Sequence, residues 1–367
     1  MDSPLFTPTT VGAWNLAHRV VLAPMTRLRA EPDDSPSDMM IDYYRQRASP
    51  GGLLITESVH PALDSRGYLG APGMYTDRHV QRWRRVVDAV HDQGGYIVAQ
   101  IAHDGRQSHI SLADGKSPIA PSEVPFQTEV FTADGWVPNS MHRALELGEI
   151  PALVDMFRLG AQGAAAAGFD GVELHAANGY LVDTFLQDGT NKRTDDYGGG
   201  VAGRARFPLQ LAAAFVDVFG ADRVGVRVSP SGTWGSISDS DPETTFGYFA
   251  ERLSDLKIAY LHVIEPRVSG TETVAEGQAP VAAAFLRQHF TGSIIAAGGF
   301  DGVGAGDIVR RGDADLVAFG RLFSSNPDLS ARLRDGWPLT PYDRDAFWGG
   351  TDHHYSDYQP YDTAQSA

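Results

Sequence analysis

Eight short apolar runs rich in β-branched residues recur along the chain, and they limit its possible folds more than any other feature. They are RVVLAPM (19–25), LLITESV (53–59), YIVAQIAH (96–103), GVELHAA (171–177), VGVRVSP (224–230), YLHVIEP (260–266), SIIAAGG (293–299) and LVAFGRLF (316–323). The runs are continuous and do not alternate with polar residues, which is typical of parallel strands covered on both faces. We therefore expect eight buried strands.

Segments with a helical spacing of apolar residues fill almost every gap between these runs. They cover residues 37–48, 76–94, 149–168, 204–220, 242–257, 281–290, 303–312 and 326–336. Residues that favour helix starts stand at Asp77, at Asp241 before Pro242, and at Asn326 before Pro327. Eight strands alternating with eight helices are the pattern of a closed parallel (β/α)8 barrel, the TIM barrel. No linker divides the chain, so we predict a single α/β domain over residues 1–367.

Three segments fall outside this repeating pattern. Residues 1–18 are expected to form an N-terminal hairpin across the barrel floor, because Gly12 separates two short apolar stretches. Residues 104–148 follow the third strand and are too long for an ordinary loop, which is typical of a lid or a binding insertion. Residues 338–367 form a C-terminal tail.

Composition excludes several classes of partner and site. The formal net charge of −16 repels phosphate backbones and anionic membrane surfaces, so neither nucleic acid nor membrane is an expected partner. The absence of cysteine excludes disulfides, thiolate metal sites and cysteine nucleophiles. The histidines lack a zinc spacing such as HExxH, and we expect no metal. With no apolar run long enough to cross a bilayer and no signal-peptide pattern, we expect a cytoplasmic protein.

Polar side chains gather at the carboxyl ends of the predicted strands, where barrel enzymes place their catalytic groups. His175, Asn178 and Tyr180 follow the fourth strand. Similar polar residues end other strands: Thr26, Gln100, His103 and Arg227. Taken singly, His175 could be a satisfied core histidine and Asn178 part of a turn. Three together favour a bound polar ligand, because polar side chains inside apolar runs need partners.

The ends of the seventh and eighth strands suggest a phosphate site. Gly298, Gly299 and Phe300 offer backbone amides after the seventh strand, and Gly320 with Arg321 follows the eighth. Barrel enzymes commonly hold a phosphate in these two loops. The alternative is that the glycines only allow tight turns from strand to helix.

Several longer blocks carry a resemblance to a known family. They are RVVLAPMTRLRA (19–30), LLITES (53–58), RGYLGAPGMYTD (66–77), QIAHDGRQSH (100–109), GFDGVELHAANGYLVDTFLQDGTNKRTDDYGG (168–199), VGVRVSP (224–230), LHVIEPR (261–267), AAGGFD (296–301) and VAFGRLFSSNPDL (317–329). Over nearly its whole length the chain resembles the Old Yellow Enzyme family of FMN-dependent ene-reductases. The resemblance implies an NAD(P)H oxidoreductase that binds FMN and takes its hydride from NADPH or NADH.

The resemblance also implies where the flavin and its substrate bind. The residues expected to contact the cofactor are Pro24, Met25, Thr26, Ser58, Gln100, Arg227, Gly298, Gly299, Phe300, Gly320, Arg321 and Phe347. Arg227 would stabilise the negative charge of reduced flavin, and Thr26 would tune its potential. His175 and Asn178 would donate hydrogen bonds to the carbonyl oxygen of an activated alkene, and Tyr180 would protonate its α-carbon.

The substrate pocket departs from the family pattern. Its expected residues are Thr26, Tyr68, Ala102, His175, Asn178, Trp234 and Trp348. Ala102 stands where many relatives have tryptophan, and Trp348 stands where they have tyrosine, so we hypothesise that volume lost at one position is restored at the other. Tyr68 could instead pack on the prolines of its own loop. Gly235 replaces a polar side chain that can touch the nicotinamide, which leaves the preference for NADPH or NADH open.

Two other functions remain compatible with the residues alone. A sugar-phosphate lyase or isomerase would use the phosphate site without flavin, but no lysine base is apparent at a strand end. A non-catalytic FMN-binding protein would leave the arrangement of His175, Asn178 and Tyr180 without a purpose. We expect a small-molecule alkene as the partner and a monomer or small homo-oligomer as the assembly.

Overall fold

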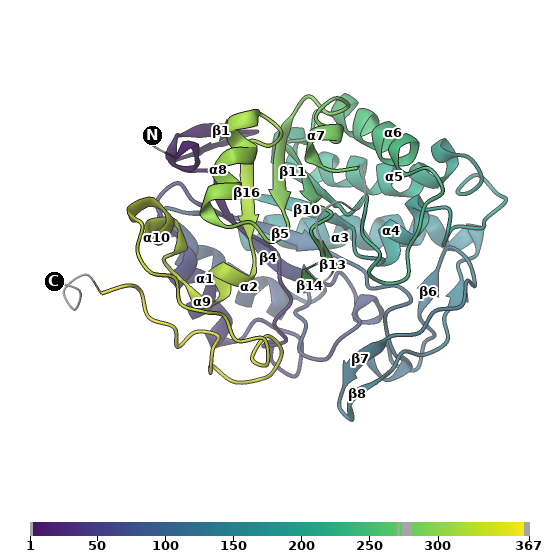
Figure 1. The fold of residues 1–367 in the computed structure, drawn as a ribbon. Helices are drawn as coiled ribbons and strands as arrows, with labels where there is room; N and C mark the ends of the chain where they lie inside the picture. Colours follow the sequence, from purple (N-terminus) through teal and green to yellow (C-terminus); the bar gives the residue numbers. More distant parts are fainter. Residues whose placement is uncertain (1–2, 270–271, 274–280, 363–367) are drawn as a thin grey trace.

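Eight parallel strands close into a barrel, as the sequence predicts (Figure 1). The computed structural model describes residues 3–269, 272–273 and 281–362. The barrel strands are β3 (Val20–Leu22), β4 (Leu53–Val59), β5 (Tyr96–Ile101), β10 (Gly171–Ala176), β11 (Val224–Val228), β12 (Tyr260–Ile264), β15 (Ser293–Ala297) and β16 (Leu316–Phe319). Each strand lies within one of the eight apolar runs, so the predicted fold class is confirmed.

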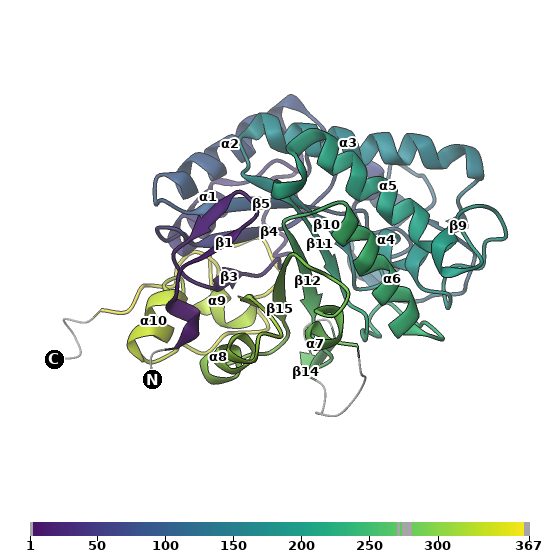
Figure 2. The ribbon, with the colours of Figure 1, turned by 90° about the horizontal axis from the view of Figure 1, so that it is seen from above.

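Helices surround the barrel (Figure 2). Those that follow barrel strands are α1 (Asp38–Arg47), α2 (Asp77–His91), α3 (Ile150–Ala167), α5 (Val201–Phe219), α6 (Pro242–Asp255), α7 (Ala283–Leu286), α8 (Gly302–Arg311) and α10 (Leu329–Asp335). Two short helices that the spacing did not predict are α4 (Leu181–Leu186) and α9 (Arg321–Ser325). The helix predicted over 281–290 is correct in place but reduced to the four residues of α7.

The predicted helix starts have different outcomes. Asp241 caps α6 by accepting a hydrogen bond from the backbone N–H of Thr244, with Pro242 in the first turn, which confirms that prediction. Asp77 lies in the first turn of α2, and the cap is the preceding Thr76. The prediction for Asn326 is wrong, because its amide donates to the carbonyls of Leu322 and Thr340 and ends α9.

Alternation along each strand separates two interiors. On β10, Val172 and Leu174 belong to the large core that also contains the apolar faces of the helices. They therefore face outward, between the strands and the helices. Glu173 and His175 alternate with them and therefore face into the barrel. The barrel interior is thus apolar near its floor and polar near the carboxyl ends of its strands.

An N-terminal hairpin closes the barrel floor, as predicted. Strands β1 (Thr9–Val11) and β2 (Trp14–Leu16) pair antiparallel around Gly12, whose φ of 51° is left-handed. A Cβ at Gly12 would lie 2.0 Å from the carbonyl oxygen of Asp222, so only glycine fits this approach. Trp14 belongs to the apolar cluster of the inward-facing strand residues.

The segment 104–148 is folded and lies at the other end of the barrel from the hairpin (Figure 1). It contains β6 (Ile119–Ala120), paired with β9 (Arg143–Ala144), and the hairpin of β7 (Glu129–Thr132) with β8 (Gly135–Pro138). Shorter elements elsewhere are β13 (Val268–Ser269), β14 (Glu272–Thr273) and 3-10 turns at 4–6, 63–65, 110–112, 147–149 and 221–223.

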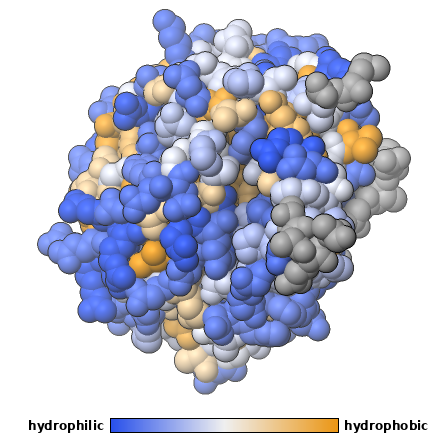
Figure 3. Space-filling view, turned by 90° about the vertical axis from the view of Figure 1, so that its left-hand side faces the viewer, coloured by the Kyte–Doolittle hydropathy of each residue, from blue (hydrophilic) through white to orange (hydrophobic). Residues whose placement is uncertain are grey.

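The C-terminal tail follows α10 without regular structure and returns to the barrel mouth. Its last residues, 363–367, lie outside the described part of the chain. The surface seen in Figure 3 is largely hydrophilic, with apolar side chains in small scattered groups. Among the described residues, no helix has both the length and the apolar character needed to cross a bilayer.

Candidate active site

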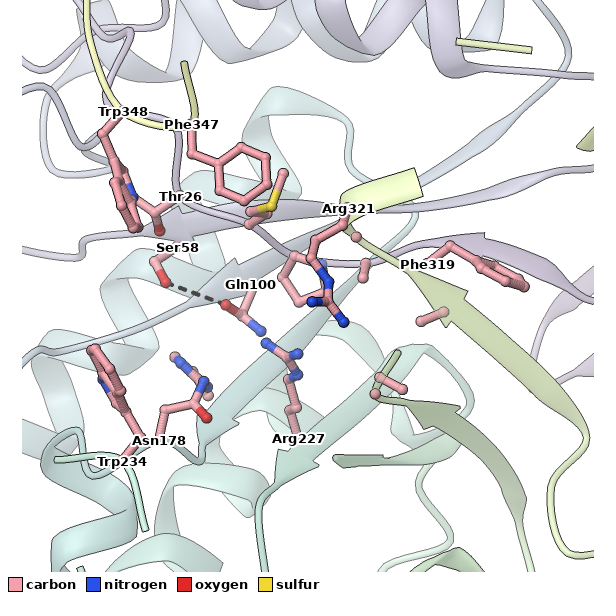
Figure 4. A pocket seen from close by; sticks show the side chains of 18 of the residues that line it. Thr26, Ser58, Gln100, Asn178, Arg227, Trp234, Phe319, Arg321, Phe347 and Trp348 are labelled. Carbon is pink, nitrogen blue, oxygen red and sulfur yellow. Dashed lines mark hydrogen bonds between the residues drawn. The ribbon is translucent and has the colours of Figure 1, made fainter. Parts of the chain in front are cut away.

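A cavity of about 770 Å³ opens where the barrel strands end, and it gathers almost all the predicted site residues. Those that line it are Pro24, Met25, Thr26, Ser58, Tyr68, Gln100, His175, Asn178, Tyr180, Arg227, Trp234, Gly298, Gly299, Phe300, Gly320, Arg321, Phe347 and Trp348. Figure 4 shows Gln100, Arg227 and Arg321 pointing toward its middle. These side chains come from strands far apart in the sequence, and barrel closure brings them together.

Ala102 is the predicted pocket residue that the structure does not bring to the cavity wall. It follows β5, is fully buried, and its backbone N–H donates to the carbonyl of Val59 at 3.0 Å. The exchange of volume between Ala102 and Trp348 stays a hypothesis, with Trp348 on the wall and Ala102 behind it.

The sequence reasoning missed the part of the wall that comes from the insertion. Trp136 on β8 lines the cavity, and its ring centroid lies 5.7 Å from that of Trp348 and 6.2 Å from that of Tyr68. Thr128 and Glu129 lie beside it on the wall. The signal was present as an isolated tryptophan in a polar insertion, but only the fold shows which way the hairpin turns.

His175 is held neutral at the end of β10. Burial, followed by the positive charge of Arg227, lowers the pKa of His175 well below its usual value. Its Nδ1 is buried and has no hydrogen-bond partner within the described part of the chain. A neutral imidazole offers one N–H donor, so His175 can bind an oxygen of a ligand without carrying charge.

Asn178 is fixed by its backbone, which leaves its side-chain amide for the cavity. Its φ of 59° is left-handed, a conformation that asparagine tolerates better than most residues. The backbone N–H donates to Ser229 Oγ at 2.8 Å, and the carbonyl accepts from Gln107 Nε2 at 2.9 Å. Asp183 accepts from the next N–H, that of Gly179, at 2.9 Å. Figure 4 shows the Asn178 side chain directed into the cavity.

Tyr180 and Tyr68 form a hydroxyl pair in the wall. Their Oη atoms lie 3.4 Å apart, and either can donate. Burial, more than any neighbouring charge, raises the pKa of both phenols above their usual value. The ring of Tyr180 lies 5.3 Å from that of His175, measured between centroids. Tyr180 is therefore a protonated phenol next to a neutral imidazole.

The floor of the cavity contains one guanidinium and one amide. Gln100 Oε1 accepts from Ser58 Oγ at 3.3 Å, and Arg227 lies opposite His175 in the strand register. The Nε of Arg227 is buried without a hydrogen-bond partner in the described residues. A buried unpaired donor is costly, so this atom points to a polar ligand with an acceptor, such as the pyrimidine edge of a flavin.

The ends of β15 and β16 form an open cradle. Gly298 and Gly299 have φ values of 131° and 65°, and a Cβ at Gly320 would meet only Ala23 and Met25, at 3.9 Å. The guanidinium of Arg321 lies over the ring of Tyr342, 5.7 Å from its centroid. Backbone amides at glycine turns next to an arginine suit a phosphate group.

No group of three or more histidine, aspartate or glutamate side chains that could hold a metal occurs among the described residues. The donor set at the cavity is instead one of amides, hydroxyls and guanidinium groups. These residues fit FMN: Gly298, Gly299 and Arg321 would hold its phosphate, while Gln100 and Arg227 would hold the ring.

Comparisons with known proteins agree with this geometry. The model of the NADH:flavin oxidoreductase / NADH oxidase family matches residues 4–340. Flavin oxidoreductase hxnT of Emericella nidulans is 40% identical over 377 residues, covering 97% of each chain. The 12-oxophytodienoate reductase 2 of Arabidopsis thaliana is 40% identical, with 94% of this chain and 92% of that protein covered.

Solved structures show the same likeness over the whole chain. Morphinone reductase in complex with tetrahydroNAD is 42% identical and superposes with a TM-score of 0.91, covering 99% of both chains. The Old Yellow Enzyme homologue from Zymomonas mobilis is 38% identical, with a TM-score of 0.93 over 97% of this chain and 99% of that one. The chain therefore belongs to the NADH:flavin oxidoreductase / NADH oxidase family, the family of Old Yellow Enzyme.

Proposed function

We propose that this FMN-dependent NAD(P)H oxidoreductase, a flavin-dependent ene-reductase, reduces activated alkenes with Tyr180 as the proton donor. The substrates would be α,β-unsaturated ketones and aldehydes, maleimides and nitroalkenes. The observation that carries the proposal is the meeting of three neutral donors, His175, Asn178 and Tyr180, in one cavity wall. Relatives named 12-oxophytodienoate reductase and morphinone reductase support an oxo compound as substrate.

The donors of the site would act on two atoms of the substrate, the carbonyl oxygen and the α-carbon. When bound, FMN supplies the hydride for the β-carbon, after taking it from NADPH or NADH. His175 and Asn178 donate hydrogen bonds to the carbonyl oxygen and stabilise the negative charge that develops there. Tyr180 gives its hydroxyl proton to the α-carbon, and the hydroxyl of Tyr68 can then donate a hydrogen bond to the phenolate.

The proposal needs no base in the site. Burial keeps His175 uncharged and Tyr180 protonated, so both are donors at neutral pH. The complex of morphinone reductase with tetrahydroNAD supports a nicotinamide as the hydride donor here. The residues that would decide between NADPH and NADH include Gly235, and both coenzymes remain part of the proposal.

Stopped-flow mixing tests the two half-reactions separately. NADPH or NADH should bleach the yellow enzyme, and cyclohexenone or maleimide should then restore the colour. Bleaching followed by recovery only with oxygen would mean that the protein oxidises nicotinamide but does not reduce alkenes. A colour that persists under both coenzymes would contradict the proposal altogether.

We further propose that residues 104–148 act as a lid, in a cytoplasmic protein that is a monomer or small homo-oligomer. Trp136 supports the lid, because it brings the insertion to the cavity wall. The net charge of −16 favours a protein that stays dispersed in solution. Light scattering after size-exclusion chromatography determines the assembly, and a protected tryptic site within 104–148 on phenol binding would support closure.

A further inference from the structure

A layer of buried polar side chains lies inside the barrel directly below the cavity floor. The strand register places Glu173 of β10 beside Gln100 of β5, and Arg227 of β11 beside His262 of β12. Gln100 and Arg227 line the cavity, whereas Glu173 and His262 lie behind them with no exposed surface. Gln100 and Arg227 would hold the flavin ring, whereas Glu173 and His262 behind them have no assigned role.

The carboxylate of Glu173 is held on both oxygens. Oε1 accepts from Gln100 Nε2 at 2.7 Å, and Oε2 accepts from His262 Nδ1 at 2.9 Å. Burial alone would raise the pKa of Glu173, but its interactions with His262, Arg227 and Gln100 outweigh burial and lower the pKa. Burial lowers the pKa of His262 in turn, so at neutral pH the imidazole donates its hydrogen bond without adding a positive charge. Glu173 is therefore an ionised carboxylate in the barrel interior, even though a buried charge is expensive.

This negative charge acts on the cavity floor in two ways. The hydrogen bond to Nε2 fixes the orientation of the Gln100 amide, so that its Oε1 faces Ser58 and the cavity. The charge also offsets part of the positive charge that Arg227 presents to the cavity. Electrostatic effects are strong here because the low dielectric of the interior screens them weakly.

We propose that Glu173 is a positioning residue that lowers the reduction potential of bound FMN. Reduction adds negative charge to a flavin, and charges near its ring tune that equilibrium. A carboxylate behind Arg227 opposes the added charge, so bound FMN gives up its hydride more readily than it would above Arg227 alone. This inference rests on FMN binding in the cavity and not on the proposed alkene chemistry.

The test is a spectroelectrochemical titration of the FMN-loaded enzyme without any alkene. Glu173→Gln keeps the side-chain volume and removes the charge, and its midpoint potential should rise. We expect at least a tenfold change in the two-electron equilibrium constant, which corresponds to about 30 mV. Glu173→Asp keeps the charge at a shorter reach, and its potential should stay close to that of the wild type.

Tyr260→Phe is the matched control. Tyr260 belongs to the same buried layer, and its ring crosses β11 at Gly225, where a Cβ would lie 2.1 Å away. Losing its hydroxyl changes packing and polarity without changing a full charge, so the potential should move less than in Glu173→Gln. The FMN dissociation constant of each variant, from fluorescence titration, shows whether the substitution has disrupted the cavity floor enough to weaken cofactor binding.

Two results would overturn the inference. One is a Glu173→Gln enzyme whose potential is unchanged or lower. The other is a Glu173→Asp enzyme whose potential shifts as far as that of Glu173→Gln, because a purely structural role would disturb both. If Glu173→Gln does not fold, Glu173→Asp is compared with the wild type alone: a midpoint potential within about 30 mV of the wild type supports the inference, and a larger shift overturns it. Loss of alkene reduction leaves the measurement unaffected, since no alkene is present.

Discussion

Burial keeps the imidazole of His175 and the phenol of Tyr180 neutral. It lowers the pKa of the histidine and raises the pKa of the tyrosine, and both groups face the same cavity. Both residues can then donate a hydrogen over the whole range around neutral pH. In the proposed reaction, Tyr180 transfers its proton to the substrate, whereas His175 only donates a hydrogen bond.

Replacing Tyr180 by phenylalanine separates these two roles. Tyr180→Phe should slow alkene reduction by about 10²- to 10⁴-fold, the usual contribution of a general acid, while reduction of the flavin by NADPH or NADH stays nearly intact. Stopped-flow absorbance measures each half-reaction. Tyr68→Phe, which removes the neighbouring hydroxyl, is the matched control and should slow alkene reduction less. If the rates of both half-reactions fell equally in Tyr180→Phe, Tyr180 would not be the proton donor.

Replacing His175 by alanine tests hydrogen bonding to the carbonyl oxygen. His175→Ala should lose about 2–4 kcal/mol of transition-state stabilisation, the range for one oxyanion donor. The loss appears as a fall in kcat/KM for cyclohexenone, and phenol should also bind more weakly. His289→Ala is a distant control, since His289 pairs with Glu251 away from the cavity. An unchanged phenol dissociation constant in His175→Ala would mean that the ring does not touch the ligand oxygen.

At the scale of elements, the turn from β10 into α4 determines where Asn178 points. Asp183, on the first turn of α4, accepts hydrogen bonds from Gly179 N at 2.9 Å and from Gln187 Nε2 at 2.8 Å. Burial is the main cause that raises the pKa of Asp183 from 3.8 to about 7. The buried carboxyl group of Asp183 thus stabilises the turn, and it binds a proton more tightly in the folded than in the unfolded protein.

This shift predicts how stability responds to pH. Because the pKa of Asp183 is higher in the folded than in the unfolded protein, its protonation adds to the free energy of unfolding. This contribution, at most about 4 kcal/mol, is fully present below pH 3.8 and is lost as the pH rises to about 7. Asp183→Asn has no such proton, so it should gain stability relative to the wild type between pH 4 and pH 7. Urea unfolding at several pH values measures this difference.

The difference in unfolding free energy between variant and wild type removes the contributions of other buried titratable groups, which both proteins share. His103, whose pKa burial lowers to about 4, adds the opposite slope to both proteins. Glu57, raised to about 7 by burial, adds a slope of the same sign to both. A constant difference in unfolding free energy across this pH range would show that Asp183 ionises normally in the folded protein.

At the scale of the whole molecule, the loop after β3 and the C-terminal tail meet at the cavity. Arg29 donates to the carbonyls of Ala346 at 3.0 Å, Phe347 at 2.8 Å and Thr351 at 3.1 Å. Arg27, two residues earlier, donates to the carbonyl of Phe347 at 2.8 Å. These hydrogen bonds hold the tail at the barrel mouth, where Phe347 forms part of the wall.

Removing one of these arginines should loosen the tail and weaken cofactor binding. Arg29→Met removes the three hydrogen bonds from Arg29 to the tail, each worth about 0.5–1.5 kcal/mol, while Arg27 still donates to the carbonyls of Ala346 and Phe347. We expect a lower unfolding free energy and faster FMN release, measured by urea unfolding and flavin fluorescence. Arg45→Met is the control, because Arg45 makes an exposed ion pair with Asp42, worth less than about 1 kcal/mol. Equal effects in both variants would show that the tail does not depend on Arg29.

Local patterns in the sequence determined the barrel and most of its site. The eight apolar runs follow from the burial of parallel strands on both faces, and polar residues at their carboxyl ends meet once the barrel closes. His175 and Arg227 could be placed at one mouth because this needs only strand order and direction. The hairpin around Gly12 was likewise visible in the chain itself.

Tertiary structure alone decided what depends on contacts between distant segments. Trp136 reaches the wall because of how the insertion folds back, whereas Ala102 is fully buried and does not line the cavity. Asn326 has the chemistry of a helix start but is used by the tail, through the carbonyl of Thr340. Glu173 could not be paired with His262 from sequence, since strand alternation gives the facing side and only the register gives the neighbour.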